Sequence, residues 1–407
     1  MTWQADVVIV GAGPAGAACG ILLAERGLEV VVLDRARFPR PKICGEYLSP
    51  EAARILDRLG VLKTLDGLGA VPLTGMRITA PDGTVVSGTY RAVRSWQPYR
   101  EHAIGLRRAT LDAALVDRLR ALPVDFREQV RVTDVLLDGL QVVGVQAVDA
   151  EHRQHTIRAP LVIGADGRTS VVAQRLGCRR PHPLQRMALV TYVNGVRACR
   201  DVGEIFIDPP DYAILNPLAP NLVNMSLVVP LPHATPWRGR LETFFAARTR
   251  QLRHLAARVA GAERVAPVQA MGPLAYRVER PRQGGVLLVG DAAGFYDPLT
   301  GEGVFSGLRA AELAAETVAA AWRAGDWSAR TLGTYDTARQ QIFTAKARFI
   351  YALHFVLRHR RLANVTAHIL ARRPGLMDVV LGIVGDYVPP SALFRTAVSS
   401  ADAASTP

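Results

Sequence analysis

Three glycines near the N-terminus have a spacing that can bind a diphosphate. Gly11, Gly13 and Gly16 follow the apolar run 7–10, which reads as a buried strand, and they open a helix of small residues. The first glycine permits a tight turn, the second lets the backbone approach a pyrophosphate, and the third lets helix and strand pack closely. Free N–H groups and the dipole at the helix N-terminus then favour an anion.

An acidic residue stands where such a site needs one. Asp34 ends the next apolar strand, 21 residues after Gly13, where a carboxylate can bind ribose hydroxyl groups. Because strand, helix and distal acid occur together, a dinucleotide site is a better explanation than a chance glycine-rich turn. The contacts expected from this segment are Gly11, Gly13, Pro14, Ala15, Gly16, Asp34 and Arg35.

Four further segments resemble a large flavoprotein family that holds aromatic-ring hydroxylases, flavin-dependent halogenases and geranylgeranyl reductases. They are Arg107-Arg-Ala-Thr-Leu-Asp112, Gly164-Ala-Asp-Gly167, Val289-Gly-Asp-Ala-Ala293 and Pro298-Leu-Thr-Gly-Glu-Gly303, and the resemblance covers most of residues 5–325. It implies FAD as the cofactor, with Asp291 on the ribose, Arg107 near the diphosphate and Asp166 near the cofactor and the nicotinamide approach. The other contacts that it implies are Cys44, Gly45, Gly290, Pro298, Gly301 and Gly303.

The last of these segments has a physical reason to lie beneath the flavin pyrimidine ring. Reduced flavin carries negative charge around N1 and the C2 carbonyl. A helix that starts at Gly303 would present backbone N–H groups and the positive end of its dipole to that charge. Gly301 and Gly303 would leave room for the ring.

The segment Lys42-Ile-Cys-Gly-Glu-Tyr-Leu-Ser-Pro50 bears on the type of reaction. Its first half resembles the geranylgeranyl reductases, whose cysteine lies by the flavin, and its second half resembles halogenases. Cys44 is therefore a candidate catalytic thiol. The alternative is a small buried residue without chemistry, because cysteine is often simply buried.

A reductase motif, Tyr-x-Trp-x-Phe-Pro, is only partly present. The stretch Tyr212-Ala-Ile-Leu-Asn-Pro217 keeps its tyrosine and proline, which makes Tyr212 and Pro217 candidate substrate contacts, but has Ile214 and Asn216 in place of the aromatic residues. This weakens the assignment to isoprenoid reductases. The tryptophans form no halogenase motif and no GxSxG occurs, so halogenation and serine hydrolysis are disfavoured.

These observations favour an NAD(P)H-dependent monooxygenase that hydroxylates a hydrophobic small molecule. The alternative is a flavoprotein that reduces double bonds of a prenyl lipid. No second GxGxxG follows a strand, so NAD(P)H is expected to bind transiently, without a Rossmann domain of its own.

Composition limits the other classes of function. The chain has 407 residues and a net charge of +13, from 49 Lys+Arg against 36 Asp+Glu, but no nucleic-acid-binding motif. Its four cysteines lack CxxC spacing, which favours a reducing cytoplasm and no metal site. No apolar run reaches the ~20 residues that cross a bilayer.

One basic segment lies near the C-terminus. No acidic residue occurs between Asp336 and Asp378, whereas Arg358, Arg360 and Arg361 and further basic residues lie within it, mixed with apolar ones. One interpretation is peripheral membrane contact through residues 340–375. The other, which the sequence favours slightly, is a helix that packs over the substrate domain with its arginines outward.

Together the patterns predict an α/β protein with a Rossmann-like (glutathione-reductase-type) FAD-binding domain, a β-sheet substrate domain and a helical C-terminal part. The FAD-binding domain is expected to be discontinuous, over residues 1–75, 100–175 and 276–325. The substrate domain is expected over 76–99 and 176–275, and the helical region over 326–407.

Overall fold

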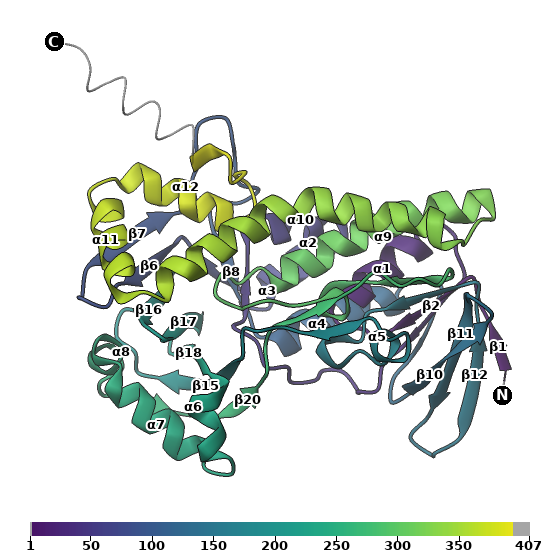
Figure 1. The fold of residues 1–407 in the computed structure, drawn as a ribbon, viewed down its shortest axis with the longest axis horizontal. Coiled ribbons are helices and arrows are strands. Elements are labelled where there is room, and N and C mark those ends of the chain that lie inside the picture. Colours follow the sequence, from purple (N-terminus) through teal and green to yellow (C-terminus); the bar gives the residue numbers. More distant parts are fainter. Residues whose placement is uncertain (1, 394–407) are drawn as a thin grey trace.

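The computed structural model describes residues 2–393, which form an α/β fold around a parallel sheet (Figure 1). This sheet has the strand order β22-β13-β2-β3-β9. In that order its strands are Val286–Leu288, Leu161–Gly164, Val7–Val10, Val30–Leu33 and Val124–Arg127. The first four are buried on both faces, which is why they appear in the sequence as continuous apolar runs.

Alternate residues of β2 belong to two different cores, because successive side chains of a strand point to opposite faces. Val7 and Ile9 share a buried cluster with residues of α1 (Pro14–Ala24), α4 (Arg108–Arg120) and α9 (Gly303–Ala324). Val8 and Val10 share another with a second sheet, β1-β12-β11-β10. Its strands are Thr2–Gln4, Gln154–Arg158, Gln141–Val148 and Arg131–Asp138. The parallel sheet is thus sandwiched between helices and this second sheet.

A third, largely antiparallel sheet stands beside this layered part, in the order β19-β15-β18-β17-β16-β6-β7, with β20 also paired to β15. The strands are Glu263–Arg264, Arg186–Asn194, Leu222–Pro230, Asp211–Ala219, Val202–Asp208, Gly75–Thr79, Val85–Thr89 and Gln269–Met271. Strands β6 and β7 form an antiparallel hairpin, and β6 runs parallel to β16. The hairpin is therefore joined to strands that follow it by more than a hundred residues.

The C-terminal part is helical, as expected, and consists of α10 (Ala329–Leu357), α11 (Arg360–Ala371) and α12 (Pro374–Val384). Pro374 is the first residue of α12, a position where a missing N–H costs nothing. Helices α11 and α12 pack on β7 (Figure 1). Residues 394–407 of the expected helical region lie outside the described residues.

Shorter elements complete the described chain. The helices are α2 (Pro50–Arg58), α3 (Leu62–Gly67), α5 (Val171–Arg175), α6 (Leu231–Ala234), α7 (Leu241–Gln251) and α8 (Arg253–Arg258). The strands are β4 (Tyr47–Leu48), β5 (Val71–Leu73), β8 (Ala103–Gly105), β14 (Arg179–Pro181) and β21 (Tyr276–Val278). Single 3-10 turns cover Gly167–Thr169, Thr235–Trp237 and Gly290–Ala293.

Candidate active site

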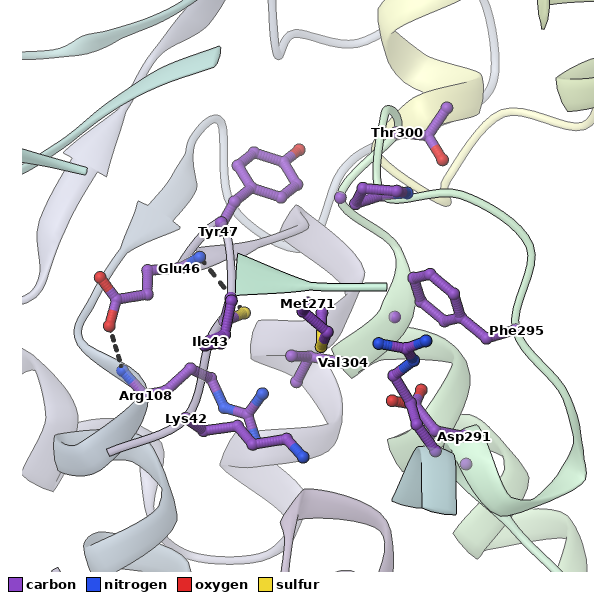
Figure 2. Close-up of a pocket in the computed structure, with 18 of the residues that line it drawn as sticks. Lys42, Ile43, Glu46, Tyr47, Arg108, Met271, Asp291, Phe295, Thr300 and Val304 are labelled. Carbon is purple, nitrogen blue, oxygen red and sulfur yellow. Dashed lines mark hydrogen bonds between the residues drawn. The ribbon is translucent and has the colours of Figure 1, made fainter. Parts of the chain in front are cut away.

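One large cavity, of about 910 Å³, runs from the end of the parallel sheet to the C-terminal helices. Its lining comes from segments far apart in the sequence. Figure 2 shows the loop from Lys42 to Tyr47 on one side, with Asp291, Phe295 and Thr300 on the other. The cavity has a charged end beside β2 and α1 and an apolar end beside α10–α12.

The N-terminus of α1 opens into the charged end. Gly13 is its N-cap and Pro14 its first residue, and no side chain caps it. Gly11 has a φ of 98°, and a Cβ there would lie 2.6 Å from the Ala165 carbonyl oxygen. A Cβ at Gly16 would lie 1.9 Å from the Gly11 oxygen, so Gly16 permits close packing and does not itself line the cavity. This end has the features of a pyrophosphate site.

The carboxylate of Asp34 is held at the tip of β3. Its oxygens accept hydrogen bonds from the N–H groups of Ala12 and Ala36, both at 2.8 Å. Arg40 bridges this carboxylate to Asp112, at 3.9 and 3.4 Å respectively. Asp34 and Arg35 both line the cavity, in the position expected for the ribose end of the cofactor.

Two further carboxylates line the charged end. Burial raises the pKa of Asp291, while nearby Lys42 opposes that shift, and burial in turn lowers the pKa of Lys42. Burial also raises the pKa of Asp166. Its Oδ2 accepts a hydrogen bond from Val171 N at 2.6 Å, whereas its buried Oδ1 has no partner among the described residues. A buried carboxylate oxygen without a hydrogen-bond partner is uncommon, and Asp166 is one of the residues that line the cavity.

The loop that carries Cys44 is fixed by Glu46, a buried residue with a φ of 57°. Its carboxylate accepts hydrogen bonds from Arg108 N, Tyr192 Oη and Asn224 Nδ2, at 2.9, 3.0 and 3.0 Å. Burial raises its pKa, and these bonds oppose the shift. Cys44 is half-buried and lines the cavity, and its Sγ accepts a hydrogen bond from Glu46 N at 3.3 Å.

The segment 298–303 closes the middle of the cavity, where Pro298, Gly301 and Gly303 line it. A Cβ at Gly301 would lie 2.5 Å from the Tyr47 ring. The hydroxyls of Tyr47 and Tyr90 are 2.5 Å apart, and burial raises the pKa of both, so they stay protonated at neutral pH. The buried Thr300 Oγ1 has no partner among the described residues. At Gly301 the missing side chain leaves room for the Tyr47 ring, and the expectation that Gly301 and Gly303 leave room for the flavin ring stays a prediction.

Beyond this point the lining is apolar. Strands β6 and β7, β16 and β17, and helices α10–α12 contribute Met76, Ile78, Val86, Ile205, Ile207, Ile214, Leu353, Val356, Leu357, Ala363, Ala367, Leu370, Met377, Val380, Leu381 and Val384. Ala80 and Tyr90, which directly follow β6 and β7, also line the cavity. The polar residues contributed by these same elements are Asn216 and Thr366, and neither is charged. We call this part the apolar lobe.

Most of the expected cofactor contacts share this one cavity. The lining includes Gly11, Gly13, Pro14, Ala15, Asp34, Arg35, Cys44, Gly45, Asp166, Gly290, Asp291, Pro298, Gly301 and Gly303. Arg107 does not line it, because its guanidinium lies over the Tyr192 ring, 4.8 Å from the centroid. The next residue, Arg108, lines the cavity instead and is paired with Asp112.

The expected substrate contacts lie outside the lining. Tyr212 is fully buried and donates a hydrogen bond from its hydroxyl to Asp297 at 2.5 Å, and Pro217 faces the opposite side of β17 from Ile214 and Asn216. The two residues that replace the aromatic positions of the reductase motif, Ile214 and Asn216, are those that reach the cavity.

Sequence reasoning also missed several lining residues. Lys42 and Tyr47 lie within the segment that was singled out for Cys44, and Phe295 lies between two recognised motifs, so their positions in the chain were an available signal. For the lining residues of α10–α12 the helical pattern gave no such signal.

Comparisons with known proteins agree with this geometry. Residues 4–349 match the family described as FAD binding domain. The chain is 28% identical over 409 residues to menaquinone reductase of Mycolicibacterium smegmatis, covering 95% of this chain and 93% of that protein. It is 30% identical over 345 residues to digeranylgeranylglycerophospholipid reductase 1 of Methanopyrus kandleri, covering 83% of this chain and 86% of that protein.

Other similarities extend the range of relatives. The chain is 27% identical over 340 residues to conditioned medium factor receptor 1 of Dictyostelium discoideum, which covers 81% of this chain but 66% of that protein. A solved flavin-dependent brominase superposes with a TM-score of 0.83 over 98% of this chain and 99% of its own, at 24% identity, which shows a shared fold. The chain belongs to the FAD-binding family of oxidoreductases, and its cofactor is FAD.

Proposed function

We propose that this oxidoreductase reduces a carbon–carbon double bond of a prenyl lipid. The observation that supports this most is the apolar lobe of the cavity. The strands and helices that form the lobe contribute no charged side chain to its lining. A prenyl chain offers only apolar surface, so burial in such a lobe is favourable, by about 25 cal/mol per Å². A charged or strongly polar substrate would lose its hydration there without compensation.

The electrons for this reduction would come from a nicotinamide cofactor. Reduction adds two electrons and two protons across the double bond, and NAD(P)H is the reductant typical of the family. FAD, when bound, passes the electron pair from that reductant to the substrate. Two relatives that cover most of the chain are named as reductases of menaquinone and of a digeranylgeranyl lipid, which supports a substrate with a prenyl chain.

The protein's own part in this reaction is to position the reactants and exclude water. Asn216 donates a hydrogen bond to the Gly45 carbonyl oxygen at 2.8 Å, and Asn224 donates one to the Cys44 carbonyl oxygen at 2.9 Å. These bonds hold the loop that carries Cys44 against the third sheet. Cys44, carried by this loop, lines the cavity.

A second candidate is the NAD(P)H-dependent monooxygenase that the sequence favoured. One observation supports it: Ile214 and Asn216, which line the cavity, stand where the reductase motif has aromatic residues. Hydroxylation also needs a dry pocket more than a particular side chain. The two reactions differ in their use of oxygen and in the atoms that they add.

The decisive experiment is turnover of the FAD-loaded protein with NADH or NADPH, with and without oxygen. Menaquinone and digeranylgeranylglycerophospholipid would be offered in detergent, and products identified by mass spectrometry. The reductase predicts anaerobic products whose prenyl chain, identified by its fragment ions, has gained two hydrogens; a gain confined to the quinone ring of menaquinone would not count as the proposed reaction. Products that gain one oxygen, formed only in air, would instead establish the monooxygenase and reject the reductase.

The variant Cys44→Ser tests whether the thiol takes part in the reaction, as the reductase proposal allows and the monooxygenase does not require. If the thiol takes part in the reduction, we expect turnover to fall by at least 10-fold while FAD is retained, because removing one acid–base group typically costs about 10²–10⁴-fold. Cys178→Ser, at a buried cysteine outside the cavity, is the control. Unchanged reductive turnover in Cys44→Ser would make Cys44 a packing residue.

A further inference from the structure

The outer sides of α10 and α11 expose large apolar side chains. Tyr351 and Phe355 on α10 are 43% and 60% exposed, and Leu362, Val365 and Ile369 on α11 are 41%, 56% and 47% exposed. Their spacings of three and four residues place them along one side of each helix. Phe355 lies near the turn between the two helices, where its ring centroid is 4.8 Å from that of His359. We call this surface the helix corner.

Several exposed arginines lie on α10 and α11 or directly after these helices, and they form no ion pair with an acidic residue among those described. Arg348, Arg358, Arg361, Arg372 and Arg373 are exposed, and none forms an ion pair with another described residue. Arg360 differs, because it is paired with Asp208 at 2.6 Å and donates to the Pro81 carbonyl oxygen. His368 likewise lies 3.6 Å from Asp82. The paired residues hold α11 to the third sheet, whereas the unpaired arginines are free to meet an external negative charge.

The same two helices form the wall of the apolar lobe. Leu353, Val356 and Leu357 of α10, and Ala363, Ala367 and Leu370 of α11, line the cavity on their inner side. Each helix therefore has one side toward the lobe and one side exposed. The helices α10 and α11 thus stand between the lobe and the exterior.

We propose that the helix corner docks on a bilayer that contains anionic lipid, so that the apolar lobe lies next to the membrane from which a prenyl lipid enters. This inference deepens the proposed function and rests on it for the substrate. Exposed apolar residues beside unpaired arginines are the combination that binds peripherally to anionic membranes. No helix among residues 2–393 is long and apolar enough to span a bilayer, so the contact would be at the surface.

Charge argues for a lipid surface over a second copy of the chain. Two copies meeting through this face would bring unpaired arginines against one another, which is unfavourable for like charges. An anionic bilayer supplies both the negative charge and the apolar interior that the exposed side chains need. Each basic residue near such a surface adds roughly 1 kcal/mol, or about five-fold in binding.

The test measures sedimentation of the FAD-loaded protein with vesicles of phosphatidylcholine, with or without phosphatidylglycerol. One variant is Arg358→Glu with Arg361→Glu, and another is Phe355→Ser with Val365→Ser. Arg360 is left intact because its ion pair has a structural role. The matched control is Leu140→Ser with Arg282→Glu, at an exposed site outside the helix corner, near the β10–β11 turn.

We expect the wild type and the control to bind anionic vesicles and to bind neutral ones at least 10-fold more weakly. Both helix-corner variants should lose at least 10-fold in binding to anionic vesicles while keeping FAD. Equal binding by wild type and variants, or none by the wild type, would overturn the proposal. So would a helix-corner variant that changes the oligomeric state without vesicles, since the face would then be an interface between copies.

The membrane contact and the reaction can fail separately. Turnover of a prenyl lipid presented in detergent does not need a bilayer. If the protein reduces that lipid in detergent but never binds vesicles, the docking proposal is wrong and the reductase stands. If it binds vesicles through the helix corner but reduces no prenyl lipid, the proposed reaction is wrong.

Discussion

At the scale of single residues, the charged end of the cavity depends on Asp291 and its basic neighbour Lys42 (Figure 2). Asp291 lies in the 3-10 turn Gly290–Ala293, shortly after β22, and lines the cavity together with Gly290. We expect Asp291→Ala to weaken FAD binding by about 10- to 100-fold, because a hydrogen bond to a charged group contributes about 1.5–3 kcal/mol. The measurement is flavin absorbance per protein after gel filtration.

The control for this prediction is Asp138→Ala, at an exposed carboxylate in the β10–β11 turn. It should retain FAD fully. If Asp291→Ala also retains stoichiometric FAD with unchanged affinity, the ribose role assigned to Asp291 is wrong.

At the scale of elements, the contact between β2 and α1 depends on a glycine that never reaches the cavity. A side chain at Gly16 would meet the Gly11 oxygen at 1.9 Å, so the helix N-terminus would have to move. We expect Gly16→Ala to lower the free energy of unfolding by about 1–3 kcal/mol, a typical cost of overpacking, and to reduce FAD binding. Gly67→Ala, where a Cβ meets nothing within 4 Å, should change neither. Denaturant unfolding and FAD titration measure both effects.

A second element-level contact joins three helices. Lys346 of α10 pairs with Glu302, the N-cap of α9, at 2.8 Å and also with Asp386, which follows α12. Burial raises the pKa of Asp386 to about 6, against the opposing effect of Lys346. A carboxyl whose pKa rises on folding stabilises the folded state while protonated, and this contribution is lost as the pH rises through the folded pKa.

The pH dependence of stability follows from that shift. The free energy of unfolding of the wild type, taken relative to Asp386→Asn, should fall between about pH 4 and the folded pKa and then stay level. Asparagine is chosen because it tolerates the φ of 73° at this position. Urea unfolding at several pH values measures the difference, and a difference that grows with pH would contradict the assignment.

At the scale of the whole molecule, the cavity couples the parallel sheet to the C-terminal helices. Ala367, buried on α11, lines the apolar lobe, whereas Ala371 on the same helix is exposed. We expect Ala367→Phe to fill part of the lobe and to reduce turnover of long prenyl chains at least 10-fold, with a smaller effect on short ones and no loss of FAD. Ala371→Phe is the control. Equal turnover of all chain lengths by Ala367→Phe would place the substrate elsewhere.

Local patterns in the sequence were sufficient for the cofactor end of the site. The strand before Gly11, the glycine spacing and the carboxylate of Asp34 all depend on short-range backbone geometry, so they could be recognised without the fold. The β6–β7 hairpin and the start of α12 at Pro374 also depend on local chemistry, because turn residues and proline act over a few positions.

Side-chain direction could not be predicted in the same way. Arg107 and Arg108 are neighbours, yet one lies over Tyr192 and the other lines the cavity, because adjacent residues at a helix start point in different directions. On β17 the lining residues are Ile214 and Asn216, whereas the recognised motif had pointed to Tyr212 and Pro217.

The sequence by itself therefore determined the parallel core, the FAD motif and the helical C-terminal segment, since each follows from periodicity or from glycine and proline geometry. Only the tertiary structure decided that α10 and α11 form the wall of the apolar lobe while exposing apolar residues on their other side. The physical reason is that an amphipathic pattern shows which side of a helix is apolar, and not which neighbour, cavity or surface that side will meet.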